Sequence, residues 1–174
     1  MLPDIFYKII MLPAIIKGMT VGERSIIYPG YDLFFIRFKN VILKKNVIIG
    51  KSAWISTINF GKLVVGNNTH IGRRVTIAAA KSIIIGDDCL ISYDVSILDH
   101  DHDFISQKGK DNIGKSKKII IGDNCFIGAH SFILKGVHLG NNCVVGANSV
   151  VTKSFSDYSV IVGNPAKLIR KKKN

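Results

Sequence analysis

The sequence predicts an all-β solenoid, a parallel β-helix built from six-residue repeats. From Ile121 the chain reads IGDNCF, IGAHSF, ILKGVH, LGNNCV, VGANSV and VTKSFS, with an aliphatic residue at position one and usually a small or β-branched residue at position five. A helix would instead place apolar residues at i, i+3, i+4 and i+7. Three sixes make one triangular coil, and stacking coils about 4.8 Å apart buries their inward side chains. We expect the glycines of the repeats to occupy tight corners with positive φ.

Composition agrees with a single folded domain. The chain has 174 residues, of which 47% are hydrophobic and 21% charged, with a net charge of +12. The apolar content excludes a disordered basic tail protein, and the charge predicts an anionic partner. Nucleic acid is not the expected partner, because aromatic residues are not interleaved with the basic ones.

The three cysteines are an odd number in a chain with no secretory signature, which argues against a disulfide framework. Cys125 and Cys143 are 18 residues apart, so they are expected to stack on successive coils. We expect Cys89, Thr69 and Ala53 to continue the same inward column. A catalytic or metal-binding role is therefore not assigned to the thiols.

The repeat divides the chain into three parts. Residues 1–40 are expected to form an N-terminal docking segment and a first irregular coil, residues 41–156 the β-helix, and residues 157–174 a C-terminal cap with a basic tail. The spacing from Ile85 to Ile121 leaves room for an extra segment, a polar and basic loop at about 103–118. Insertions in solenoids project from one face and often carry function.

The apolar run near the N-terminus is shorter than the roughly 20 residues that span a bilayer. No basic region precedes it and no small-residue cleavage site follows it, so we expect no signal peptide and a cytoplasmic protein. Docking onto the main body is the favoured interpretation. Peripheral membrane contact, helped by Lys8 and Lys17, is the second interpretation.

Residues 41–170 resemble the hexapeptide-repeat acyltransferases, and three blocks resemble their sugar and polysaccharide O-acetyltransferase branch. These blocks are ILDHDHDF before the loop, IGDNCFIGAHS after it, and VGANSVVTKSF followed by VIVGNPAKLIR. The resemblance implies a left-handed coil and a homotrimer with active sites between subunits. It also implies acetyl-CoA as co-substrate and a carbohydrate acceptor.

The histidines before the loop are the candidate catalytic residues. By resemblance, His102 matches the general base, a task that suits the near-neutral pKa of histidine. His100 points the same way in an extended segment and is the rival. Asp99 and Asp101 are both candidates to orient an imidazole in the acceptor site, and the sequence does not decide between them. We expect no metal site, because neighbours on one strand cannot all converge on an ion.

Further site residues follow from the resemblance. Phe126 takes an aromatic position near the acetyl group and acceptor. Gly128 and Ala129 match the position whose backbone N–H contacts the thioester carbonyl, and Ala147 matches a contact to the pantetheine arm. Ordinary packing and corner positions are the alternative interpretations for these residues.

Four residues near the C-terminus match or extend the family's coenzyme A site. They are Thr152, Lys153, Lys167 and Arg170. Lysine and arginine suit the phosphates of coenzyme A. A solvated basic tail is the alternative interpretation.

Together these residues predict an acetyl-CoA-dependent O-acetyltransferase that acts on a bacterial surface polysaccharide or lipopolysaccharide sugar. Residues 78–80 are alanines where galactoside enzymes carry polar residues, which disfavours a galactoside. N-acetylation of an amino sugar is the closest rival. A non-catalytic β-helix is less favoured, because the chain lacks regular threonine arrays. A zinc carbonic anhydrase is disfavoured, because no H-x4-H pair occurs.

Overall fold

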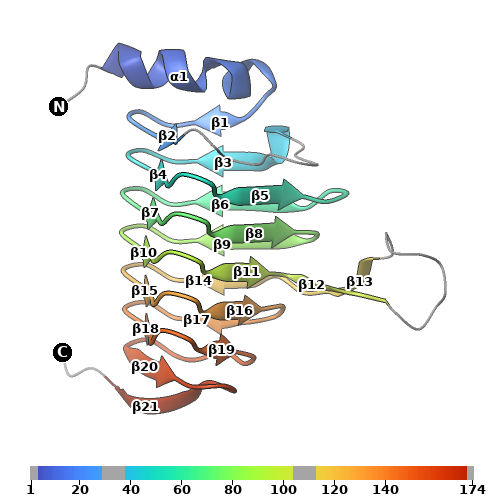
Figure 1. Cartoon of the computed structure of the whole chain (residues 1–174), viewed down its shortest axis with the longest axis vertical. Coiled ribbons are helices and arrows are strands. Elements are labelled where there is room, and N and C mark those ends of the chain that lie inside the picture. The colour runs from blue at the N-terminus through green and yellow to red at the C-terminus, as the bar shows by residue number, and fades with distance from the viewer. Residues whose placement is uncertain (1–3, 29–37, 104–112, 172–174) are drawn as a thin grey trace.

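The chain forms a parallel β-solenoid with a helix across one end and a hairpin projecting from one edge (Figure 1). The computed structural model describes residues 4–28, 38–103 and 113–171. Within these ranges, three sheets run along the solenoid, parallel except for the last strand of the second sheet, and each full coil contributes one strand to each sheet.

The first sheet consists of β1 (Thr20–Val21), β3 (Val41–Leu43), β6 (Lys62–Val65), β9 (Ser82–Ile85), β14 (Ile119–Ile121) and β17 (His138–Leu139). The second consists of β2 (Ile26–Ile27), β4 (Ile48–Ile49), β7 (His70–Ile71), β10 (Leu90–Ile91), β15 (Phe126–Ile127), β18 (Val144–Val145), β20 (Ser159–Val162) and β21 (Lys167–Lys171). The third consists of β5 (Trp54–Thr57), β8 (Thr76–Ala79), β11 (Ser96–Leu98), β16 (Phe132–Leu134) and β19 (Val150–Val151). The hairpin consists of β12 (His100–His102) and β13 (Ile113–Ser116), and a short 3-10 helix covers Phe38–Asn40.

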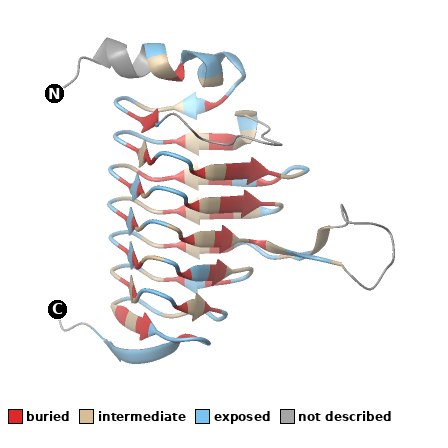
Figure 2. Cartoon of the chain, viewed as in Figure 1, coloured by how far each residue is buried: buried red, intermediate tan, exposed pale blue. Residues whose placement is uncertain are grey.

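The register places equivalent inward residues of successive coils directly on one another. In the third sheet, Ile97 pairs with Ile77 on one side and with Ile133 on the other, and all three are fully buried. Figure 2 shows the buried positions recurring along the strands of successive coils. Each coil therefore buries its aliphatic residues against the coils above and below, as the six-residue spacing predicts.

The three cysteines lie buried in one column with Thr69, and all three are free thiols. Each of these four residues directly precedes a paired residue of the second sheet. The expected continuation at Ala53 is wrong: Ile48 pairs with His70, so Val47 stacks beneath Thr69. Ala53 instead lies in the column of Val75. Counting by sixes fails here because a turn at 58–61 lengthens this coil.

The glycines at position two of the repeat allow close stacking and have no positive φ, whereas Gly136, at position four, has a φ of 81°. A Cβ added to Gly122 would lie 2.7 Å from the carbonyl carbon of Gly140 in the next coil, and one added to Gly86 would lie 2.7 Å from that of Gly122. Neither glycine has a positive φ; that conformation falls two residues later, at Asn124 (φ 53°) and Asp88 (φ 56°). The predicted corner is therefore present, but a short polar residue turns it.

Two caps close the solenoid. The helix α1 (Asp4–Ile16) crosses the N-terminal end (Figure 1), and the amide of Ile27 donates a 3.3 Å hydrogen bond to Met11 Sδ. At the other end, β21 folds back antiparallel on β20. In the described part of the chain, no helix is long and apolar enough to cross a membrane.

Candidate active site

Asp99 is the anchor of the candidate site. It follows β11 and is fully buried. Its carboxylate accepts hydrogen bonds from three consecutive backbone amides of the coil above: Ala80 at 2.7 Å to Oδ1, and Lys81 at 2.8 Å and Ser82 at 2.7 Å to Oδ2. A buried carboxylate needs such partners, because an unpaired buried charge is costly.

The surroundings of Asp99 favour its ionised form. Burial acts to raise the pKa of this carboxyl group, but the hydrogen bonds from His100 and from the three amides outweigh burial and hold the pKa below its ordinary value. Asp99 Oδ1 also lies 3.1 Å from His100 Nδ1. A carboxylate at this position fixes the orientation of the His100 ring.

The two histidines lie on β12, the first arm of the projecting hairpin. The His100 side chain is 5% exposed, whereas His102 is an exposed residue. Their rings meet edge to face, with centroids 5.6 Å apart. Of this pair, His102 therefore offers an exposed imidazole, and it rests against the buried ring of His100, which Asp99 orients.

Asp101 lies between the histidines in the chain, but its carboxylate forms an ion pair with Lys135 of the next coil. The amide of Lys117 also donates a 2.8 Å hydrogen bond to the carbonyl of Asp99. These contacts fasten the base of the hairpin to the solenoid. The insertion thus begins at the histidines rather than after them, and its predicted middle, residues 104–112, lies outside the described residues.

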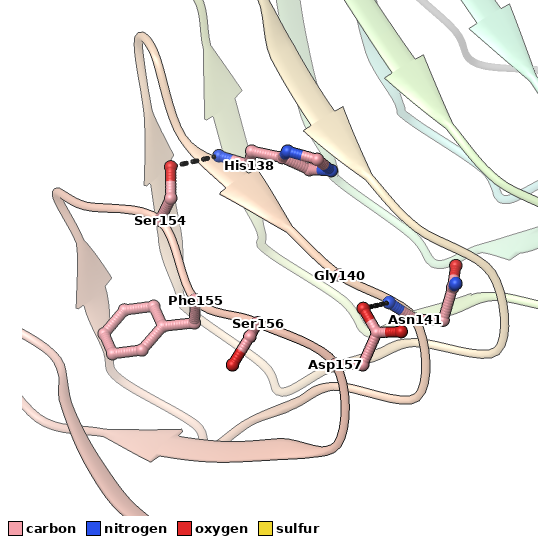
Figure 3. Close-up of a pocket in the computed structure, with 7 residues that line it drawn as sticks. All are labelled: His138, Gly140, Asn141, Ser154, Phe155, Ser156 and Asp157. Carbon is pink, nitrogen blue, oxygen red and sulfur yellow. Dashed lines mark hydrogen bonds between the residues drawn. The ribbon is translucent and has the colours of Figure 1, made fainter.

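Thr152 and Lys153 lie on the same edge of the solenoid as the hairpin, in the turn that follows β19. Both are exposed, and Lys153 Nζ lies 5.7 Å from the centroid of the Phe155 ring. Phe155 lines a surface pocket of about 450 Å³ (Figure 3). The other lining residues are His138, Gly140, Asn141, Ser154, Ser156 and Asp157.

The pocket has a polar wall and basic neighbours. The backbone amide of His138 donates to Ser154 Oγ at 2.9 Å, and that of Asn141 donates to Asp157 Oδ1 at 3.0 Å (Figure 3). Lys171 Nζ donates to Ser156 Oγ at 2.8 Å. Lys167 and Arg170 lie exposed on β21, at the same end of the solenoid.

The remaining predicted residues lie on the opposite edge of the solenoid, where Figure 1 shows β15 and β18. Phe126 is 38% exposed on β15, Gly128 and Ala129 follow that strand, and exposed Ala147 follows β18. The hairpin that carries His102 projects from the other edge, beyond the third sheet (Figure 1). One chain therefore does not bring this group together with His102.

Sequence reasoning missed two clusters. Lys135 pairs with Asp101, and on the opposite edge Tyr93 meets the ring of His130 edge to face, with centroids 5.3 Å apart. Asp94 connects His130 to Arg74, whose guanidinium Nη2 lies 2.6 Å from the carboxylate. Arg74, Asp94 and His130 each occupy the fourth position of a six-residue unit, so the repeat itself could have placed them on successive coils. Within residues 4–28, 38–103 and 113–171, no group of three or more His, Cys, Asp or Glu side chains could hold a metal ion.

The six-residue repeat matches a known family model over part of the chain. Residues 62–97 and 118–153 match the family model "hexapeptide repeat of succinyl-transferase". A comparison with curated proteins gave no match.

Solved structures match a larger share of the chain than the family model does. A D94N mutant of AntD, an N-acyltransferase from Bacillus cereus in complex with dTDP and coenzyme A, is 25% identical with a TM-score of 0.79, over 93% of this chain and 88% of that one. The polySia-specific acetyltransferase NeuO is 31% identical with a TM-score of 0.63, over 76% of this chain and 62% of that one. A galactoside acetyltransferase in complex with coenzyme A is 31% identical with a TM-score of 0.67, over 74% and 64%.

The chain carries the hexapeptide repeat, and the solved structures that it resembles are acyltransferases of the left-handed β-helix type, including sugar acetyltransferases. The fold class predicted from the six-residue spacing and from the family resemblance is confirmed.

Proposed function

We propose that the chain transfers an acetyl group from acetyl-CoA to a sugar hydroxyl, with His102 as the general base. The observation that carries this proposal is the exposed His102 ring, supported by the His100–Asp99 pair at the base of the hairpin. The neighbours supply the substrate classes: two were solved with coenzyme A, and NeuO and the galactoside enzyme are acetyltransferases by name. A sugar of a bacterial surface polysaccharide or lipopolysaccharide is the proposed acceptor.

The proposed reaction is direct transfer. The imidazole of His102 takes the proton of the acceptor hydroxyl as its oxygen attacks the thioester carbonyl carbon. The new C–O bond forms, the C–S bond then breaks, and the departing thiolate recovers the proton from the imidazolium. A backbone N–H at Ala129 would stabilise the oxyanion, a contribution that mutagenesis in other enzymes puts at several kcal/mol.

The separation of the two residue groups supports an active site between subunits. His102 lies on the hairpin edge, whereas Phe126, Ala129 and Ala147 lie on the opposite edge. Packing the hairpin edge of one chain against the opposite edge of another would complete the site. We propose a homotrimer, as the family resemblance implies, because a head-to-tail interface of this kind can close into a ring.

The anionic part of coenzyme A is proposed to lie over the basic end of the solenoid. Lys153, Lys167 and Arg170 are all exposed there, and Lys153 borders the pocket of Figure 3. Charge-assisted hydrogen bonds to phosphate would hold the co-substrate in register with the acyl site.

A second candidate function is N-acylation of an amino sugar. The observation in its favour is that AntD, an N-acyltransferase, matches over 93% of this chain, more than NeuO or the galactoside enzyme does. Amine and hydroxyl acceptors need similar base chemistry, so the same residues would serve either.

The test is acetyl transfer from acetyl-CoA to a panel of sugars and amino sugars, read by mass spectrometry. Mild alkali then separates the candidates, because it releases an acetyl group from an ester and leaves an amide intact. An alkali-labile product supports the first proposal and an alkali-stable one supports the second. Failure to acetylate any member of a panel that includes polysaccharide fragments would count against both.

A further inference from the structure

The helix α1 exposes an apolar face at the N-terminal end of the solenoid. Ile9, Leu12 and Ile16 are 64%, 50% and 75% exposed, and Ile15 is 37% exposed. Ile9, Leu12 and Ile16 follow the i, i+3, i+7 spacing that places side chains on one face of a helix. From Ile9 to Ile16 the helix has no polar side chain.

Capping the solenoid does not require this exposed face. Met11 is 3% exposed, and Ile10 and Ala14 pack against the core, so the opposite side of the helix already covers the last coil. Terminal caps of solenoids need a polar outer face for solubility. At the other end of the molecule, β21 exposes Lys167, Arg170 and Lys171 besides Leu168 and Ile169. The outward face of α1 carries no such polar residue between Ile9 and Ile16.

Two lysines flank the end of this apolar face. Lys17 directly follows α1, is exposed, and holds its Nζ 5.2 Å from the centroid of the Phe38 ring. Lys39 is exposed and adjoins the turn at Gly18, where a Cβ added to the glycine would lie 3.5 Å from the Cβ of Lys39. Basic residues beside an exposed apolar helical face are complementary to an anionic lipid surface.

We propose that α1, with Lys17 and Lys39, docks the protein on the surface of an anionic lipid bilayer. The helix lies across the end of the coil stack (Figure 1), so its outward face can enter the headgroup region while the coils extend away from it. It is not a spanning segment, since no described helix is long and apolar enough to cross. The proposal rests on the exposed residues of this end and not on the proposed function.

The test is co-sedimentation of the full chain with vesicles, without acetyl-CoA. Vesicles of phosphatidylglycerol and phosphatidylcholine are compared with vesicles of phosphatidylcholine alone. We expect binding to the anionic vesicles that weakens as salt is raised. The double variant Leu12→Gln, Ile16→Gln should bind at least roughly tenfold more weakly, because it removes two apolar side chains from the interface. Glutamine keeps helix propensity, so the fold should persist.

Matched controls separate docking from general stickiness. Ile169→Gln removes an aliphatic side chain that is 61% exposed at the other end of the solenoid, and it should bind vesicles normally. Lys17→Gln with Lys39→Gln should weaken anionic binding severalfold, whereas Lys51→Gln, at an exposed turn along the solenoid, should not.

Three results would overturn the proposal. They are no binding to anionic vesicles, equal binding by the Leu12→Gln, Ile16→Gln variant, or a chain–chain association in solution that this variant abolishes. The last result would assign the face to a second copy of the chain instead. Circular dichroism of each variant confirms that the comparison is between folded proteins.

Discussion

Asp99 Oδ1 lies 3.1 Å from His100 Nδ1, while the same carboxylate accepts hydrogen bonds from the amides of Ala80, Lys81 and Ser82. One buried side chain thus joins the turn of one coil to the hairpin of the next. It holds the His100 ring against His102 and satisfies three consecutive backbone donors. Two effects are therefore expected on replacing it, one on stability and one on the imidazole pair.

Asp99→Asn should lower the free energy of unfolding at pH 7 by about 1–3 kcal/mol, because the amide cannot accept from all the donors that the carboxylate satisfies. Urea unfolding measures this. The control is Asp101→Asn, which removes an exposed ion pair and should cost about 0–1 kcal/mol.

The cost of Asp99→Asn should depend on pH. The pKa of Asp99 is lowered in the folded protein. As pH falls, the unfolded chain therefore binds the proton first, near its ordinary value of about 3.9, and stability is lost from there downward. The difference in the free energy of unfolding between wild type and Asp99→Asn should be largest near neutral pH and should shrink below about pH 4. A difference that stays constant with pH would contradict the role assigned to this carboxylate.

Gly122→Ala should destabilise the solenoid by about 1–3 kcal/mol, because the added Cβ would lie 2.6 Å from Asn141 Oδ1 and 2.7 Å from the Gly140 carbonyl carbon. Asn124→Gly should cost much less, since glycine readily adopts the positive φ found at this position. Thermal unfolding of the two variants compares them directly. If Gly122→Ala cost no more than Asn124→Gly, close stacking would not explain the glycine.

The fold was predictable because each six-residue unit repeats the same inward pair, so that Cys125 and Cys143 could be stacked from spacing alone. The predicted column of Ala53 is wrong because the six-residue pattern does not specify how many residues a turn contains. The sequence left Asp99 and Asp101 as equal candidates for another reason: the donors that hold Asp99 are backbone amides of Ala80–Ser82, and any residues there supply them. Only the structure shows which carboxylate is buried beside an imidazole.

Lys153→Ala should weaken coenzyme A binding by roughly tenfold at low salt, because it removes a cation from the proposed phosphate site. The difference should narrow as salt is added, since screening weakens the remaining long-range attraction. Isothermal titration calorimetry at two ionic strengths measures the loss of coenzyme A affinity and its dependence on salt. Lys62→Ala, an exposed lysine on β6, is the control and should leave affinity unchanged. If Lys153→Ala bound coenzyme A as tightly as wild type, this lysine would belong to the solvated surface and not to the coenzyme A site.

Mixed assemblies test whether the site lies between subunits. His102→Ala and Ala147→Trp should each be inactive when assembled alone. Co-expressed in equal amounts as a trimer, they should recover about a quarter of wild-type activity, because a site using one residue from each of two chains is intact at that frequency. If both residues of a site came from one chain, no mixed site would be intact and no activity would return.

The central claim is that His102 takes the acceptor proton, and the rate of acetyl transfer by His102→Ala tests it most directly. We predict a loss of about 10²–10⁴-fold in kcat with coenzyme A affinity nearly unchanged, because the base acts on the acceptor. His70→Ala, the same change at an exposed position on β7, should keep full activity. Turnover by His102→Ala close to that of wild type would contradict the account.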